Sequence, residues 1–219
     1  MIVAIDGPGA SGKSTVAKAV ASRLGMHYLD TGAMYRAVAW LVGREGIDLS
    51  DGDAVARLAA SAVTEVNGRV SINGHDVTEA IRTPEMDRAA AIVSRHPQVR
   101  AVLVDRQREY GREGGVVMEG RDIGSVVFPD ADVKVYLDAS PEERARRRAY
   151  DESRTPGGPA PGIADVAREL AARDTSDTTR AVSPLTRVTD AIYLDTTGLP
   201  IDEVVSRVMA IVQMKLERT

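Results

Sequence analysis

The residues with the clearest chemistry form a glycine-rich run close to the start of the chain. The run is followed by Thr15 and has the spacing G-x-x-x-x-G-K-[ST] at Gly7-Pro8-Gly9-Ala10-Ser11-Gly12-Lys13-Ser14. In such a loop several backbone N–H groups point into one concavity and hold phosphate oxygens. Lys13 would neutralise the β- and γ-phosphates, and the Ser14 hydroxyl would complete the coordination of a Mg²⁺ ion. We therefore expect residues 7–15 to bind ATP or GTP, although motors, switches and kinases all use this loop.

Arginines form a second set of candidates, because they recur where loops are expected to face a cleft. The set comprises Arg36, Arg121, Arg144, Arg147, Arg148, Arg173 and Arg180. Any one of them, taken alone, is better explained as a surface residue or an ion-pair partner. Together, around a phosphate-binding loop, they favour a site that handles a second phosphate. Because an acceptor phosphate is already ionised, no general base is needed, and the three scattered histidines suit structural or surface roles.

The apolar runs between these residues predict the scaffold that positions them. A strand from Ile2 to Ile5 precedes the loop, and an amphipathic helix from about Lys13 to Leu24 follows it. Further apolar runs predict strands at 116–118, 133–137 and 191–194, with helical patterns at 99–110, 141–150 and 201–216. This alternation predicts an α/β fold, a P-loop NTPase-type doubly wound parallel sheet of about five strands. Arg121 would then follow a strand at its carboxyl end, where such sheets bind ligands.

Two segments interrupt the alternation of strands and helices. Between about 51 and 83, the pairs Asn67-Gly68 and Asn73-Gly74 stand among β-forming residues and predict a small antiparallel hairpin insert. Residues 153–162 are rich in proline and glycine and predict the tip of a mobile lid, the alternative being a permanently flexible surface loop. Since neither a repeat nor a linker divides the remainder, we expect a single domain over 1–219.

The composition limits the partners of the protein. The formal net charge is −4, so no overall basic field attracts a nucleic-acid polymer, and anionic ligands must be held by local clusters. The absence of cysteine excludes a disulfide scaffold and a thiol-based redox or metal site. No stretch approaches the roughly 20 apolar residues that span a bilayer. The first residues do not form a signal peptide. We therefore expect a cytoplasmic protein without a membrane partner.

The motifs resemble those of the bacterial cytidylate kinases, a branch of the nucleoside monophosphate kinases, over nearly the whole chain. Besides Ile5-Asp6 and the phosphate loop that follows it, the matching segments are Asp30–Arg36, Ile81–Thr83, Pro97–Arg100, Glu119–Gly124, Val127–Ala131 and Arg180–Leu185. The patterns G-R-D-x-G and F-P-D-A within them are characteristic of this family, whereas the phosphate loop alone is not. The resemblance implies a monophosphate-binding insert at about 31–100 and a lid at about 147–164.

The same resemblance implies a reaction, in which the γ-phosphoryl group of ATP–Mg²⁺ passes directly and in line to CMP or dCMP. It assigns the acceptor phosphate to Arg36, Arg121 and Arg180. It assigns the nucleoside to Tyr35, the cytosine edge to Arg100 and Asp122, the ribose hydroxyls to Arg173 and Asp177, and a further substrate contact to Thr31. Catalysis would fall to Lys13, Arg121 and the lid arginines Arg144, Arg147 and Arg148. We expect a monomer whose partners are these small molecules.

One position departs from the family pattern, and two other functions stay open. Ala91 stands where relatives often carry a base-contacting serine, which removes one hydroxyl contact but leaves the class unchanged. A small-molecule kinase of shikimate or gluconate type would act on a hydroxyl acceptor and need fewer acceptor-side arginines. A nucleotide-dependent switch or assembly protein would bind ATP without acceptor-dependent turnover.

Overall fold

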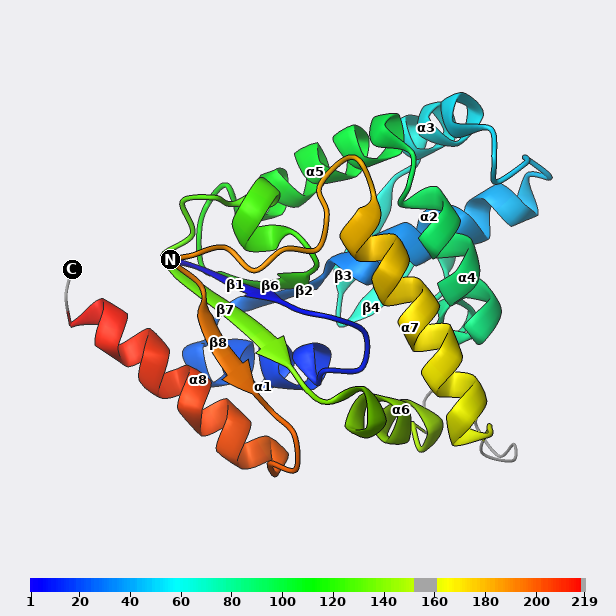
Figure 1. The fold of residues 1–219 in the computed structure, drawn as a ribbon. Coiled ribbons are helices and arrows are strands. Elements are labelled where there is room, and N and C mark those ends of the chain that lie inside the picture. Colours follow the sequence, from blue (N-terminus) through cyan, green and yellow to red (C-terminus); the bar gives the residue numbers. More distant parts are fainter. Residues whose placement is uncertain (152–160, 218–219) are drawn as a thin grey trace. The chain divides into compact units, whose positions relative to one another are not determined.

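A computed structural model describes residues 1–151 and 161–217, which form two compact units (Figure 1). The described part of the first unit consists of residues 1–29, 111–151 and 161–217, and the second unit of residues 30–110. The first unit contains the phosphate loop, and the second contains the hairpin insert. No helix in the described ranges is both long and apolar enough to cross a membrane.

The first unit is built on a parallel sheet, as the sequence predicted, with five strands in the order β2-β6-β1-β7-β8. The strands are β1 (Ile2–Asp6), β2 (His27–Asp30), β6 (Val116–Gly120), β7 (Val133–Asp138) and β8 (Ile192–Asp195). The central strands β1 and β6 are buried almost throughout, as continuous apolar runs in parallel sheets are. Their register sets Asp6 opposite Gly120 and Tyr136. The segments that follow β1, β6 and β7 therefore leave the sheet at the same edge.

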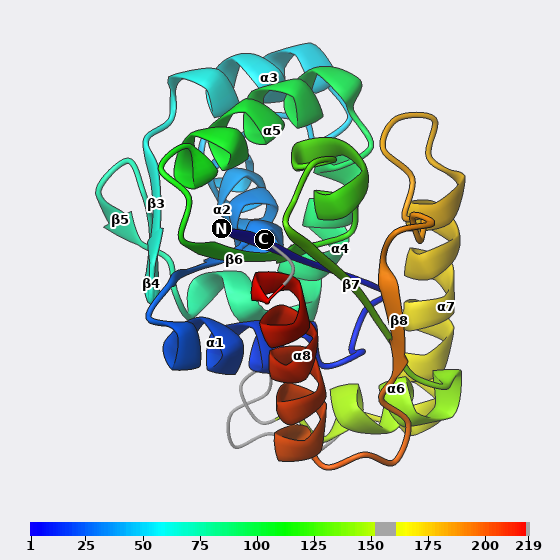
Figure 2. The same ribbon diagram turned by 90° about the vertical axis from the view of Figure 1, so that its left-hand side faces the viewer.

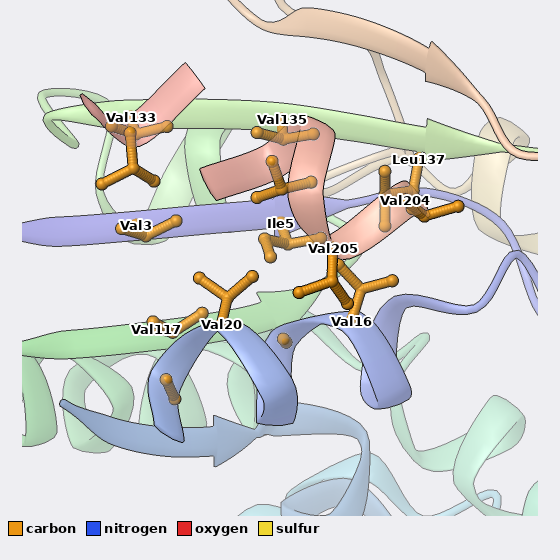
Figure 3. Packing of buried hydrophobic residues seen from close by; sticks show 14 residues of the cluster. Val3, Ile5, Val16, Val20, Val117, Val133, Val135, Leu137, Val204 and Val205 are labelled. Atoms are coloured by element: carbon orange, nitrogen blue, oxygen red, sulfur yellow. The ribbon is translucent and has the colours of Figure 1, made fainter. Parts of the chain in front are cut away.

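Two helices of the first unit, α1 (Lys13–Leu24) and α8 (Ile201–Leu216), share an aliphatic core with the sheet (Figure 3). The labelled members of this core are Val3, Ile5, Val16, Val20, Val117, Val133, Val135, Leu137, Val204 and Val205. Burial of each such side chain is worth about 1.5 kcal/mol or more. Because this core fixes both β1 and α1, the phosphate loop between them is held at both ends.

Helices α6 (Pro141–Ala149) and α7 (Ile163–Thr179) lie next to each other (Figure 2). They pack through the buried aliphatic side chains of Ala145, Ala149, Val166 and Leu170. The start of α6 has strong sequence signals, since Ser140 accepts a hydrogen bond from the Glu143 N–H at 3.2 Å and Pro141 occupies the first turn. Sequence interpretation expected Arg173 where a loop faces the cleft, and it assigned Asp177, four residues further on, to the same ligand. In the structure both lie on α7, which is a correction.

The second unit contains the predicted antiparallel insert, formed by β3 (Thr64–Asn67), β4 (Arg69–Ile72) and β5 (His75–Asp76). The turns have left-handed backbone at Gly68 (φ 70°), Asn73 (φ 48°) and Gly74 (φ 76°), so both Asn-Gly signals are confirmed. The helical elements of this unit are α2 (Thr31–Arg44), α3 (Gly52–Ser61), the 3₁₀ turn η1 (Ala80–Arg82), α4 (Pro84–Val93) and α5 (Pro97–Gly111). Of the predicted lid at 147–164, residues 152–160 lie outside the described residues.

Candidate active site

The phosphate loop connects β1 to α1 through backbone conformations that require glycine. Gly7 has φ 149°, and a Cβ at this position would lie 1.9 Å from the carbonyl oxygen of Leu137. Gly12 precedes α1 with φ 94°, a left-handed conformation that costs glycine little. The N–H groups in the first turn of α1 have no intrahelical acceptor, so the loop and the helix end together offer donors and a positive dipole to an anion.

Lys13 is buried and bends back over the loop. Its Nζ donates to the carbonyl oxygen of Pro8 at 2.6 Å and to Ser11 Oγ at 3.4 Å. Burial lowers the pKa of Lys13 to about 7, and the positive charge of Arg121 acts in the same direction. A phosphate anion would favour the charged ammonium group. Binding of an anionic ligand to the loop would therefore raise the pKa of Lys13 and stabilise its charged form.

Asp6, the last residue of β1, is absent from the predicted site residues, yet it fixes the path of the G-R-D-x-G segment. Its carboxylate accepts hydrogen bonds from the backbone N–H groups of Ile123 at 2.8 Å and Gly124 at 2.7 Å. These groups begin the π-helical turn η2 (Ile123–Val127), which follows Arg121 and Asp122. Burial raises the pKa of Asp6 to about 6. A single carboxylate ending an otherwise apolar strand was the signal that could have identified it.

Charged side chains from the segment after β6 meet those of α7 and its C-terminal end. Arg121 Nε donates to Asp177 Oδ2 at 2.9 Å, and Arg180 Nη1 lies 3.4 Å from Asp177 Oδ1. Arg180 Nη2 lies 3.9 Å from Asp122 Oδ1. Burial alone would raise the pKa of Asp177, but Arg121, Arg173 and Arg180 together hold it below its ordinary value. The structure thus brings together five predicted acceptor-side residues, with guanidinium groups in excess.

The three predicted lid arginines lie on α6 and differ in their surroundings. Arg144 is buried, and it donates to the carbonyl oxygens of Ala139 at 3.1 Å and Gly9 at 3.2 Å and to Asp174 Oδ2 at 2.5 Å. Its donors are thus directed at the protein itself. In the described structure the hydrogen bond from Arg144 to the Gly9 carbonyl oxygen connects α6 to the phosphate loop.

Arg147 and Arg148 lie close to the phosphate loop. Arg147 donates to the carbonyl oxygen of Ser11 at 3.3 Å, and a Cβ at Gly12 would lie 3.6 Å from Arg147 Nη1. A Cβ at Gly9 would lie 3.7 Å from Arg121 Nη2 and 4.0 Å from Arg148 Nη2. With Arg144, four guanidinium groups therefore border the loop, an arrangement that suits phosphate binding.

The other predicted site residues belong to the second unit. Asp30 caps α2 by accepting from the Ala33 N–H at 3.0 Å, and its second oxygen accepts from Arg36 Nη2 at 2.9 Å. The guanidinium of Arg100 lies 5.5 Å from the centre of the Tyr35 ring, and both side chains are buried. Thr31 is the first residue of α2 and is buried as well, while Ala91 lies half-buried on α4. Sequence interpretation expected Arg36 near a loop, whereas it lies on α2.

Comparison with known proteins gives these motifs a family. The family model described as cytidylate kinase matches residues 3–214. The chain belongs to the cytidylate kinase family. A cytidylate kinase of Solibacter usitatus (strain Ellin6076) is 51% identical over 218 residues, which cover 99% of this chain and 94% of that protein. A cytidylate kinase of Desulfitobacterium hafniense (strain Y51) is 49% identical over 221 residues, 98% of this chain and 94% of that one.

Two further comparisons concern domain context and fold. A bifunctional pantoate ligase/cytidylate kinase of Prochlorococcus marinus (strain MIT 9303) is 47% identical over 98% of this chain, which spans 45% of that protein. The crystal structure of a gluconokinase from Sinorhizobium meliloti 1021 covers 98% of this chain and 93% of its own, with a TM-score of 0.51 and 15% identity. At that identity the likeness shows the fold alone, and it agrees with the predicted P-loop kinase architecture.

Proposed function

We propose that the chain transfers the γ-phosphoryl group of ATP to CMP or dCMP, giving ADP and CDP or dCDP. Its membership of the cytidylate kinase family over residues 3–214 supports this reaction. The structural observation that carries the proposal is the cluster of guanidinium groups at the phosphate loop, where Arg121 and Arg148 border Gly9 and Arg147 borders Gly12. Phosphoryl transfer depends on positioning and on positive charge around the moving group, so this environment suits it.

On the donor side we propose that Gly7–Thr15 binds ATP and that Lys13 neutralises its terminal phosphates. Within residues 1–151 and 161–217, no group of three His, Cys, Asp or Glu side chains could hold a metal ion. The exposed hydroxyl of Ser14, in the first turn of α1, suits a Mg²⁺ ion bound mainly by phosphates and water. When bound, the ion would neutralise charge that develops between the β- and γ-phosphates.

On the acceptor side we propose that Arg36, Arg121 and Arg180 bind the phosphate of CMP. Arg121 is paired with Asp177 at 2.9 Å, and a phosphate would compete with this carboxylate for the guanidinium. We further propose Arg100 and Asp122 for the cytosine edge. The ribose is assigned to Arg173 and Asp177, and the remaining nucleoside contacts to Thr31 and Tyr35.

We propose that the three arginines of α6 have different roles. Arg147 and Arg148 supply charge beside the loop, while Arg144 holds Gly9 and Asp174 in place. The insert at 31–100 would bind the monophosphate, and the lid at 147–164 would exclude water from the transferred group. Closure of that lid, a monomeric state and a cytoplasmic location stay predictions.

The test is ADP release from ATP–Mg²⁺ with a panel of CMP, dCMP, UMP, AMP, gluconate and shikimate. Fast release with CMP and dCMP alone supports the proposal. Release with a sugar acid would favour a hydroxyl acceptor, and tight ATP binding without acceptor-dependent release would favour a switch. Arg121→Met should abolish the CMP-dependent rate, whereas Arg187→Met, which removes an arginine that lies 5.2 Å from the Tyr193 ring, should leave it unchanged.

A further inference from the structure

Thr196 forms a buried polar junction beside the phosphate loop, although it carries none of the roles assigned above. It directly follows β8, and only 1% of it is exposed. Its backbone N–H donates to the carbonyl oxygen of Asp138 at 2.8 Å. Its Oγ1 lies 2.8 Å from that same oxygen and 3.1 Å from the carbonyl oxygen of Ser11. One residue therefore connects β7, β8 and the phosphate loop.

The same residue binds Arg147 through two acceptors. Arg147 Nη1 donates to Thr196 Oγ1 at 2.9 Å, and Nη2 donates to the Thr196 carbonyl oxygen at 2.6 Å. On its other side, Arg147 Nε donates to Glu143 Oε1 at 2.8 Å. Hydrogen bonds from Arg146 and Arg147 hold the pKa of Glu143 down, at about 2, so this carboxylate stays charged. Glu143 at Nε and Thr196 at Nη1 and Nη2 together fix the orientation of the Arg147 guanidinium group.

The hydroxyl of Thr196 both accepts and donates hydrogen bonds, which no apolar side chain can do. It accepts from Arg147 while its single hydrogen is shared between the carbonyl oxygens of Ser11 and Asp138. Serine keeps both functions. Valine has nearly the same shape but offers neither an acceptor nor a donor, so Arg147 Nη1 would lose one of its two acceptors and the two carbonyl oxygens would lose the shared hydroxyl donor. The carbonyl contact with Nη2 persists in every variant.

We propose that Thr196 is a positioning residue for the donor nucleotide, acting through Arg147. By holding this guanidinium against Ser11 and Gly12, Thr196 places a positive charge beside the phosphate loop before ATP arrives. Such preorganisation lowers the cost of ordering a long side chain on binding. The inference rests on the proposed function, since it names a determinant of ATP affinity in the same site. The alternative is that Thr196 supports only the fold.

The test compares Thr196→Val with Thr196→Ser, and Thr189→Val serves as the matched control because Thr189 is exposed. ATP affinity is measured directly by calorimetry without acceptor, and KM for ATP, KM for CMP and kcat by ADP release. For Thr196→Val we expect Kd and KM for ATP to rise about fivefold, the size of effect that one ordinary hydrogen bond contributes. KM for CMP at saturating ATP should change less than about twofold. Thr196→Ser should match the parent within about twofold, and Thr189→Val should be indistinguishable from it.

A double-mutant cycle with Arg147→Met separates positioning from a merely structural role. In the Arg147→Met background, Thr196→Val should change ATP affinity less than about twofold. A full fivefold loss in that background, or unchanged ATP affinity in a folded Thr196→Val protein, would overturn the inference. Thr196→Ala is the second variant if Thr196→Val does not fold. If both fail to fold, the hydroxyl serves the fold and the inference is again overturned. A parent that binds ATP but does not phosphorylate CMP would refute the proposed function, while the binding measurements would still judge Thr196.

Discussion

Substitution of the buried carboxylate of Asp6 gives the most specific prediction, because its effect on stability and its effect on activity can be measured separately. Asp6→Asn keeps the shape of the side chain and removes its charge. The carboxylate accepts the N–H groups of Ile123 and Gly124 with one oxygen each. An amide offers a single oxygen, so one of the two N–H groups would face an NH₂ group. The turn that directly follows Arg121 and Asp122 would then lose one of the two hydrogen bonds that Asp6 accepts from it.

The magnitudes predict a large effect on activity and a small one on stability at neutral pH. A pKa raised from 3.8 to about 6 means that ionising Asp6 costs about 3 kcal/mol more in the folded protein than in the unfolded chain. Asp6→Asn removes this cost but leaves a buried donor unpaired, which costs about 1–3 kcal/mol. The free energy of unfolding should therefore change by less than about 2 kcal/mol at pH 8. By contrast, kcat/KM for CMP should fall about 10- to 100-fold, because the loosened turn directly follows Arg121 and Asp122.

The pH dependence has a definite sign. Since the folded protein binds the Asp6 proton more tightly than the unfolded chain, this group makes stability fall as the pH rises from about 4 to about 6. The charge of Asp122 raises the pKa of Asp6 further and that of Lys13 lowers it, so both belong to this balance. As the pH falls from 7 to 4, the parent should gain up to about 3 kcal/mol of unfolding free energy relative to Asp6→Asn. The difference in kcat/KM between the parent and Asp6→Asn should become smaller over the same pH range.

Urea unfolding at several pH values and initial rates of ADP release measure the two effects. Asp132→Asn is the matched control, because Asp132 accepts from the Ile2 N–H at 2.6 Å at the opposite end of β1. That variant should keep the parent kcat/KM. Parent-like activity of a folded Asp6→Asn protein at pH 8 would refute the positioning role. A stability difference that does not change between pH 7 and 4 would refute the raised pKa.

Three further predictions concern the loop and the acceptor. Lys13→Ala should lower kcat at least about 100-fold without lowering Tm, because it removes a cation from the transferring phosphates and relieves a buried charge. Asp122→Ala should lower kcat/KM for CMP about 10-fold or more beyond the loss for UMP, since only cytosine presents an exocyclic amine. Equal losses of kcat/KM for the two substrates would assign Asp122 a positioning role. Gly7→Ala should abolish ATP binding and lower Tm strongly, because its Cβ would lie 1.9 Å from Leu137 O. Gly25→Ala, with φ 63° and no atom within 4 Å of its Cβ, should cost only about 1 kcal/mol by denaturant titration.

Short-range signals were enough to predict much of the fold, and long-range contacts explain what was missed. The strand, glycine loop and helix at 2–24, and the two Asn-Gly turns, depend on neighbouring residues alone. The C-terminal half of α7 reads Arg173-Asp174-Thr175-Ser176-Asp177-Thr178-Thr179, which is poor in helix formers. In the structure its threonine hydroxyls bond to carbonyl oxygens of the preceding turn, and Asp174 and Asp177 pair with Arg144 and Arg121. Tertiary ion pairs thus override a weak local propensity there.

The arginine roles on α6 could not be separated from sequence for a related reason. Arg144, Arg147 and Arg148 lie three and four residues apart, so they share one face of the helix. The protein partners of these guanidinium groups lie far along the chain. Asp174 pairs with Arg144, and Thr196 accepts from Arg147. Spacing predicts the cluster but not these partners.

The residues that sequence interpretation missed have a common position, at or just after the carboxyl ends of the parallel strands. Asp6 ends β1 and holds backbone N–H groups of the turn after β6. Thr196 follows β8 and holds backbone carbonyl oxygens at the end of β7 and in the phosphate loop. Neither was among the predicted site residues, and both bind backbone groups, with Thr196 also accepting from Arg147. In an open parallel sheet the ligand-binding segments leave the same edge without pairing to one another, so their backbone groups need side-chain partners. A polar residue at or just after the carboxyl end of a parallel strand is therefore a candidate for positioning a site, even where it is not itself a predicted ligand.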